Sequence, residues 1–286
     1  MKTILVTGCS HTAGVEMSDT FVFEDYKKYL KNIKNLTKAE DEMFRVKQQI
    51  NFLLKNFNSK RFKDYVSTDP YKAGSIASKF CTLLDKTHSW PAVLQNKLLE
   101  HKVINLAWGG NSFKLNIKNA LDFIKKHNSE LIVIHQVPNY SRTYFKHNNK
   151  IHNVIGLAQL EHTRNITQNS KITHTTKILE QKYKNLVRRD VKHNYFAKAL
   201  SRYLKCLIKN SNKSIQHFFI LENVELKHIF PKQNIIIEDF KEFRKNYQMG
   251  ESHIIDPKFQ KDVADLIITK LQLKKPNKIN AFNKTY

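Results

Sequence analysis

Four short polar segments of this sequence hold the residue types that acyl transfer requires, namely a nucleophile, oxyanion donors and a general base. Ser10 is the candidate nucleophile. The backbone amides of Ser10 and Gly110 and the side-chain amide of Asn139 are candidate oxyanion donors. Near the C-terminus, Glu251 and His253 form an acid–histidine pair that could supply the base and the group that orients it. Together these residues indicate a serine-dependent reaction on an acyl group.

Glycine placement supports this choice of segments. The chain has only 7 glycines in 286 residues. Five of them fall in three of the four segments, over residues 8–14, 109–112 and 250–253. Glycine is favoured where the backbone passes close to another group or adopts a positive φ. The clustering therefore marks these segments as places where backbone meets a ligand or turns sharply.

Short apolar runs and amphipathic helices alternate along the chain, which is typical of an α/β fold with a parallel sheet covered on both faces. Ligands of such sheets bind at the carboxyl ends of the strands, where the candidate segments lie. We interpret residues 1–286 as a single domain with helical insertions at about 16–88 and 141–215. The expected strands are 3–7, 103–107, 130–137, 217–221 and 234–237, and the clearest expected helices are 37–56, 90–99, 111–127, 177–209 and 257–273.

The candidate segments resemble the conserved blocks of the SGNH (GDSL-type) hydrolases. Residues 8–14 (GCSHTAG) resemble block I in its Gly-Cys-Ser-x-Thr-x-Gly form, and 103–112 (VINLAWGGNS), with Ser-Trp-Pro at 89–91 before it, resembles block II. Residues 131–140 (LIVIHQVPNY) lie over block III, but Val137 and Tyr140 replace its usual Gly and Asp. Block V normally carries an Asp before its His, and Glu-Ser-His at 251–253 takes that place.

The resemblance implies a flavodoxin-like, three-layer α/β/α fold with a five-stranded parallel sheet. It implies that Ser10 is the nucleophile and that Ser10, Gly110 and Asn139 form the oxyanion hole. His253 would be the general base, oriented by Glu251. The expected activity is hydrolysis of an ester, an O-acetyl or short acyl group on a small molecule, glycan or lipid, without a cofactor or metal. Two alternatives stay open: an acyltransferase acting on a sugar or nucleic-acid acceptor, and a non-catalytic interaction protein with an eroded site.

Other readings of the same residues are weaker. We set His11 aside because adjacent side chains point apart, and we interpret Cys9 as a small packed residue. A dinucleotide-binding fingerprint would need a middle glycine, where this chain has His11 and Thr12. The histidines lack the HxH and HExxH spacings of metal sites. Cysteine is too sparse for a disulfide framework, at 3 residues.

The charge of the chain is strongly basic but ambiguous in meaning. Its net charge of +24 comes from 41 Lys and 8 Arg, alongside 27 Asn. Such a composition is expected from AT-rich codon usage, while nucleic-acid readers favour arginine. We expect codon bias to be the main source and polyanion binding the lesser one. With no secretory signal and no apolar window of the roughly 20 residues that a membrane span needs, we expect a cytoplasmic protein.

Overall fold

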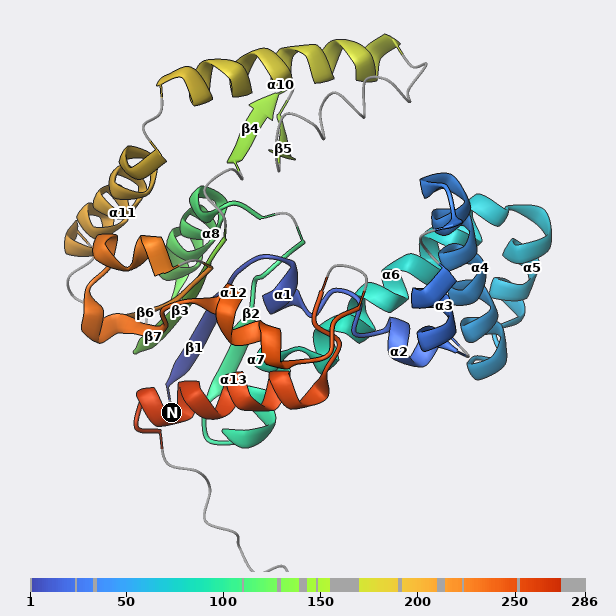
Figure 1. Ribbon diagram of the computed structural model, residues 1–286, viewed down its shortest axis with the longest axis horizontal. Coiled ribbons are helices and arrows are strands. Elements are labelled where there is room, and N and C mark those ends of the chain that lie inside the picture. Colours follow the sequence, from blue (N-terminus) through green and yellow to red (C-terminus); the bar gives the residue numbers. More distant parts are fainter. Residues whose placement is uncertain are drawn as a thin grey trace, which may run out of the picture.

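The computed structural model describes most of the chain. The described residues are 2–23, 25–32, 35–109, 111–127, 130–138, 143–147, 149–154, 170–189, 192–209, 214–222, 224–250 and 253–273. Their arrangement is an α/β fold built on a five-stranded sheet with helices on both faces (Figure 1). The expected three-layer α/β/α architecture is therefore confirmed.

All five strands of this sheet run parallel, in the order β2-β1-β3-β6-β7. This is the flavodoxin-like order, in which the switch point lies between the first and the third strand. The register pairs Thr3 with Leu131 and Thr7 with His135, so β1 and β3 end side by side. The strands are β1 (Thr3–Thr7), β2 (Lys102–Asn105), β3 (Leu131–Val137), β6 (Ile215–Leu221) and β7 (Ile235–Ile237).

The two sheet faces bury alternate residues of the same strands, as the period of a β-strand requires. Ile4 and Val6 pack in one core cluster with Trp90 of α7 (Trp90–Lys97) and with Phe259 of α13 (Pro257–Lys270). Leu5 packs in the other cluster, against α8 (Phe113–Lys126) and α11 (Lys192–Lys209). Short elements complete this part of the fold: α1 (Ser10–Ala13), α12 (Phe240–Phe243), and 3-10 turns at Val224–Ile229, Lys232–Asn234 and Arg244–Asn246.

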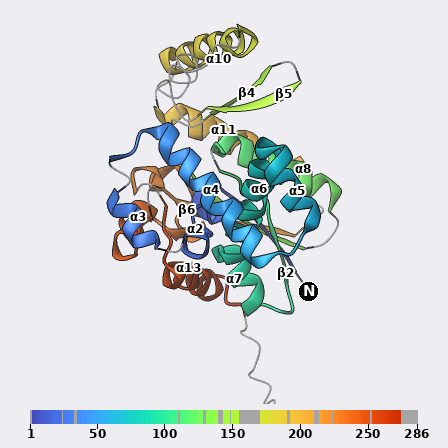
Figure 2. The same cartoon turned by 90° about the vertical axis from the view of Figure 1, so that its right-hand side faces the viewer.

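The expected insertion at 16–88 forms a helical lobe beside the sheet (Figures 1 and 2). Its helices are α2 (Asp19–Val22), α3 (Tyr26–Asn32), α4 (Lys38–Asn56), α5 (Lys60–Thr68) and α6 (Pro70–His88). Thr37 and Glu40 form the capping box that the sequence predicts at the start of α4. The lobe has two small apolar clusters, one around Leu53 and Phe62 and one around Tyr26 and Tyr29, which Ile255 from the loop before α13 joins.

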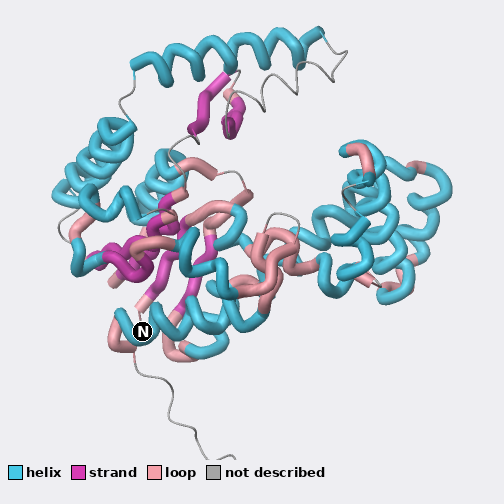
Figure 3. Tube along the Cα trace, in the orientation of Figure 1, coloured by secondary structure: helices cyan, strands magenta, loops and turns pink. Residues whose placement is uncertain are grey.

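The insertion at 141–215 is not wholly helical, contrary to the sequence prediction. It begins with an antiparallel hairpin of β4 (Thr143–His147) and β5 (Lys150–Val154), seen as two magenta strands apart from the main sheet in Figure 3. Asn149 turns this hairpin with a φ of 59°, a left-handed conformation that asparagine tolerates. Two helices follow, α10 (Ser170–Arg189) and α11. None of the helices in the described ranges has the length and apolar character needed to cross a bilayer.

Candidate active site

The candidate nucleophile lies at the carboxyl end of β1, next to the switch point of the sheet. Ser10 is the first residue of α1, and its backbone is described while its side chain is not. Gly8 provides the turn between strand and helix. A Cβ at position 8 would collide with the side chain of Thr12, so no other residue fits this turn as it stands.

Buried polar contacts tie this turn to the end of β3. The Thr12 hydroxyl donates to Gln136 Oε1, which also accepts from Cys9 Sγ at 3.4 Å. Cys9, Thr12 and Gln136 are all buried, which agrees with the interpretation of Cys9 as a packed residue. Trp108 donates its backbone N–H to Gly8 O at 3.4 Å and so brings the end of β2 to the same place.

The candidate base reaches the turn from the far end of the chain. His253 lies in a loop closed by a bridge between Met249 and Ile254, just before α13. Its ring lies against that of His11, with 5.0 Å between ring centroids. Because His11 directly follows Ser10, the candidate base lies near the turn that carries the predicted nucleophile. His11, set aside on sequence grounds, thus forms part of the wall of this site, and its Nε2 accepts from Arg244 at 2.7 Å.

The acid that holds His253 is Glu16, a residue that the sequence analysis missed. His253 Nδ1 lies 2.8 Å from Glu16 Oε1, and the backbone N–H of His253 donates to Oε2 at 3.2 Å. Glu16 is 7% exposed and has a φ of 72°. Such a left-handed backbone is rare for residues other than glycine and is typically retained at functional sites. The two-point contact with Glu16 fixes both the His253 ring and the loop that carries it.

Gly250 makes room for that carboxylate. A Cβ built at position 250 would lie 2.5 Å from Glu16 Oε2 and 2.7 Å from the Tyr26 hydroxyl oxygen. Gly250 also donates its N–H to His253 O at 2.7 Å. The glycine of the fourth polar segment therefore serves a close approach to Glu16, which explains why the sequence places a glycine here.

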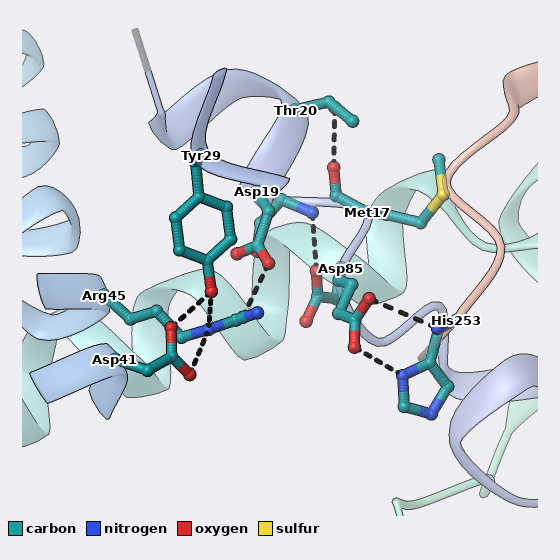
Figure 4. Close-up of polar contacts among 10 residues, drawn as sticks. Met17, Asp19, Thr20, Tyr29, Asp41, Arg45, Asp85 and His253 are labelled. Carbon is teal, nitrogen blue, oxygen red and sulfur yellow. Dashed lines mark hydrogen bonds and ion pairs between the residues drawn. The ribbon is translucent and has the colours of Figure 1, made fainter. Parts of the chain in front are cut away.

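Asp19 and Asp85 are buried carboxylates that lie between His253 and Arg45 of the helical lobe (Figure 4). Asp85 Oδ1 accepts the backbone N–H of Ser18 at 2.6 Å, and Asp19 Oδ2 pairs with Arg45 at 2.8 Å. Burial raises the pKa of Asp19 to about 7, against the opposing effect of Arg45. Burial also raises the pKa of Asp85 to about 6, and the negative charge of Glu16 adds to both shifts.

Three of the predicted site residues lie outside the described residues. They are Gly110, Asn139 and Glu251. Their described neighbours Gly109 and Pro138 follow β2 and β3, at the same edge of the sheet as Ser10. The roles of these three residues thus stay predictions. Within the described ranges, no group of three or more His, Cys, Asp or Glu residues is arranged to hold a metal ion.

Comparisons with known proteins add no family assignment. No model of a known protein family matches the chain, and no curated protein matches its sequence. The case for a function therefore depends on the motif residues and on the geometry around Ser10, Glu16 and His253.

Proposed function

We propose that the protein is a serine esterase that cleaves an O-acetyl or short acyl ester through an acyl-enzyme on Ser10. The observation that carries the proposal is the Glu16–His253 pair, held at 2.8 Å and placed beside the residue that follows Ser10. A buried acid on one imidazole nitrogen, next to a serine at a strand-to-helix turn, is the arrangement that activates a hydroxyl nucleophile.

The proposed reaction has two stages, and His253 transfers the proton in both. His253 Nε2 takes the proton of Ser10 as its oxygen attacks the ester carbonyl, and Glu16 stabilises the imidazolium that forms through Nδ1. The oxyanion is stabilised by the backbone amides of Ser10 and Gly110 and by the side chain of Asn139. The alcohol leaves with the proton from His253. Water then attacks the acyl-enzyme with His253 as base, and the carboxylic acid is released.

The single-residue test uses Ser10→Ala with Ser78→Ala as its control. Ser78 is an exposed serine of α6, so its loss changes one hydroxyl without touching the site. We expect a fluorophosphonate probe to label the wild type and Ser78→Ala covalently and to leave Ser10→Ala unlabelled. Hydrolysis of p-nitrophenyl acetate should follow the same pattern, with a loss of roughly a thousandfold or more in Ser10→Ala.

Two outcomes would overturn the proposal. One is a Ser10→Ala protein that is labelled and hydrolyses the ester like the wild type. The other is a folded wild type that the probe does not label at all, which would favour a non-catalytic interaction protein. Product analysis with sugar acceptors present then separates hydrolysis from acyl transfer.

A further inference from the structure

The net positive charge is concentrated in one of the two insertions. Residues 141–215 contain 16 Lys or Arg against 3 Asp or Glu, a formal charge of +13. Residues 16–88, of nearly the same length, contain 14 against 10, a charge of +4. More than half of the +24 therefore lies in what we call the basic insertion, residues 141–215.

AT-rich codon usage does not produce this contrast. It raises the number of lysines, and the two insertions have similar numbers of basic residues. They differ in acidic residues, whose codons are not disfavoured by the same bias. Arginine is also unevenly distributed, since 5 of the 8 in the chain fall in the basic insertion. A segment of sequence that is poor in acids and richer in arginine is typical of one that binds anions.

The described side chains of the basic insertion agree with this pattern. Lys177 on α10 and Lys198, Arg202 and Lys205 on α11 are exposed, and none of these four forms an ion pair with another described residue. Glu180 is the one acidic residue within the described ranges of the basic insertion, and Lys184 neutralises it at 2.7 Å. These four cations on the two helices thus have no ion pair with a described acidic residue.

A second group of cations lies where the basic insertion meets the sheet domain. Lys114 of α8 lies over the Tyr144 ring of the hairpin, with its Nζ 5.0 Å from the ring centroid. Burial and the nearby charge of Arg202 on α11 lower the pKa of Lys114. Two cations held near each other without a described acid between them would be stabilised by an anion bound there.

The basic insertion also has the right position to bind a substrate. Figures 1 and 2 show the hairpin and α10 standing beyond the carboxyl ends of the strands, the side of the sheet on which Ser10 begins α1. A long polymer bound to α10 and the hairpin can therefore extend toward the proposed active site.

We propose that the exposed cations of α10 and α11 bind the anionic backbone of the substrate, and that this substrate is an acylated acidic polysaccharide. The inference rests on the proposed esterase function. Uronic-acid polymers combine a carboxylate on each sugar with hydroxyls that can be esterified, so one molecule satisfies both the cationic helices and Ser10. Nucleic acids offer charge but carry phosphodiesters in place of carboxylic esters.

The test measures binding of polygalacturonate to the full-length Ser10→Ala protein. The variant carries Lys177→Gln, Lys198→Gln and Lys205→Gln, and its control carries Lys47→Gln, Lys60→Gln and Lys79→Gln, three exposed lysines of the lobe. We expect affinity to fall steeply with salt, because bound cations release counterions. The triple variant of the basic insertion should bind roughly tenfold more weakly or worse at about 0.1 M salt. The control should stay within about twofold of the parent.

Three results would overturn the inference: no binding of polygalacturonate, an equal loss in the control, or tighter binding of a duplex DNA than of polygalacturonate at equal charge concentration. The same triple substitutions in the active protein should leave hydrolysis of p-nitrophenyl acetate unchanged and raise KM on O-acetylated polygalacturonate. If the small ester is not hydrolysed while polygalacturonate binds, the proposed function fails and the polyanion surface stands without its assigned substrate. Circular dichroism confirms folding of each variant.

Discussion

Replacing Glu16 by glutamine tests the central contact of the proposed site. Glutamine has nearly the same shape, so it keeps the backbone position and removes the negative charge. In the wild type, Glu16 accepts hydrogen bonds from both Nδ1 and the backbone N–H of His253, at 2.8 and 3.2 Å. An amide in its place cannot stabilise the imidazolium and can present its NH₂ group to Nδ1, which favours the wrong tautomer.

The size of the expected loss in kcat follows from the burial of the Glu16–His253 pair. A hydrogen bond to a charged group contributes roughly 1.5–3 kcal/mol. The side chains of His253 and Glu16 are only 18% and 7% exposed, so solvent screens the contact little and the upper figure applies. About 3 kcal/mol in the transition state corresponds to a fall in kcat of roughly 150-fold, because each factor of ten takes about 1.36 kcal/mol. KM should change little, since the contact acts on the base.

The assay is the initial rate of p-nitrophenyl acetate hydrolysis as a function of substrate concentration and pH, with Glu251→Gln measured in parallel. We expect Glu16→Gln to lose kcat and Glu251→Gln to stay near the wild-type value. A folded Glu16→Gln enzyme with wild-type kcat, together with an impaired Glu251→Gln enzyme, would refute the reasoning. In that case the acid predicted from the sequence is the one that works.

Three further predictions concern packing and ionisation. In Gly250→Ala the new Cβ would lie 2.5 Å from Glu16 Oε2. The substitution should therefore reduce kcat about tenfold or more and the free energy of unfolding by roughly 1–3 kcal/mol; unchanged kinetics and melting temperature would contradict this. Burial raises the pKa of Asp19 to about 7, and its counterion is Arg45. Arg45→Met should accordingly destabilise the fold by about 2 kcal/mol in urea titrations at high pH, where Asp19 is ionised, and by less at low pH, where it is protonated. A loss that shrinks as pH rises would oppose that reasoning. Burial lowers the pKa of His217 from 6.5 to about 4. The unfolded chain therefore binds the proton first, and the neutral side chain's contribution to stability is lost as pH falls through this range. In urea titrations, the free energy of unfolding of the wild type should therefore fall by about 2–3 kcal/mol relative to that of His217→Gln between neutral pH and about pH 4.5. A constant difference between the two proteins would count against this reasoning.

Much of the fold could be predicted because its signals are local. The apolar run at 3–7 is β1 to the residue, and the Thr37–Glu40 pattern predicts the capping box that begins α4. Elsewhere the observed strand ends differ from the predicted ones by one or two residues, as for β6 and β7. The hairpin at 143–154 was missed because its strands, TYFKH and KIHNV, mix apolar with polar residues in a stretch rich in His and Asn. The Asn148-Asn149 pair between two alternating runs is nevertheless a turn signal that could have found it.

The site could be predicted only in part, because its geometry is not local. The glycine-marked turn at Ser10 and the late His253 carry sequence signals, and the structure packs the His253 ring against that of His11, the residue after Ser10. Glu16 carries none. Its role depends on a positive φ and on contact with a residue 237 positions away, and no periodicity or spacing rule encodes either property.

The separation between Glu16 and His253 also has a consequence for how the protein is made. The ribosome adds roughly 5–20 residues per second, so many seconds pass between synthesis of the acid and synthesis of its base. Until His253 has emerged, the buried carboxylates lack one of their hydrogen-bond donors and the proposed nucleophile has no base. If Ser10 is the nucleophile as proposed, a nascent chain should be inert toward esters until α13 packs against the sheet, and the onset of hydrolysis would report completed folding.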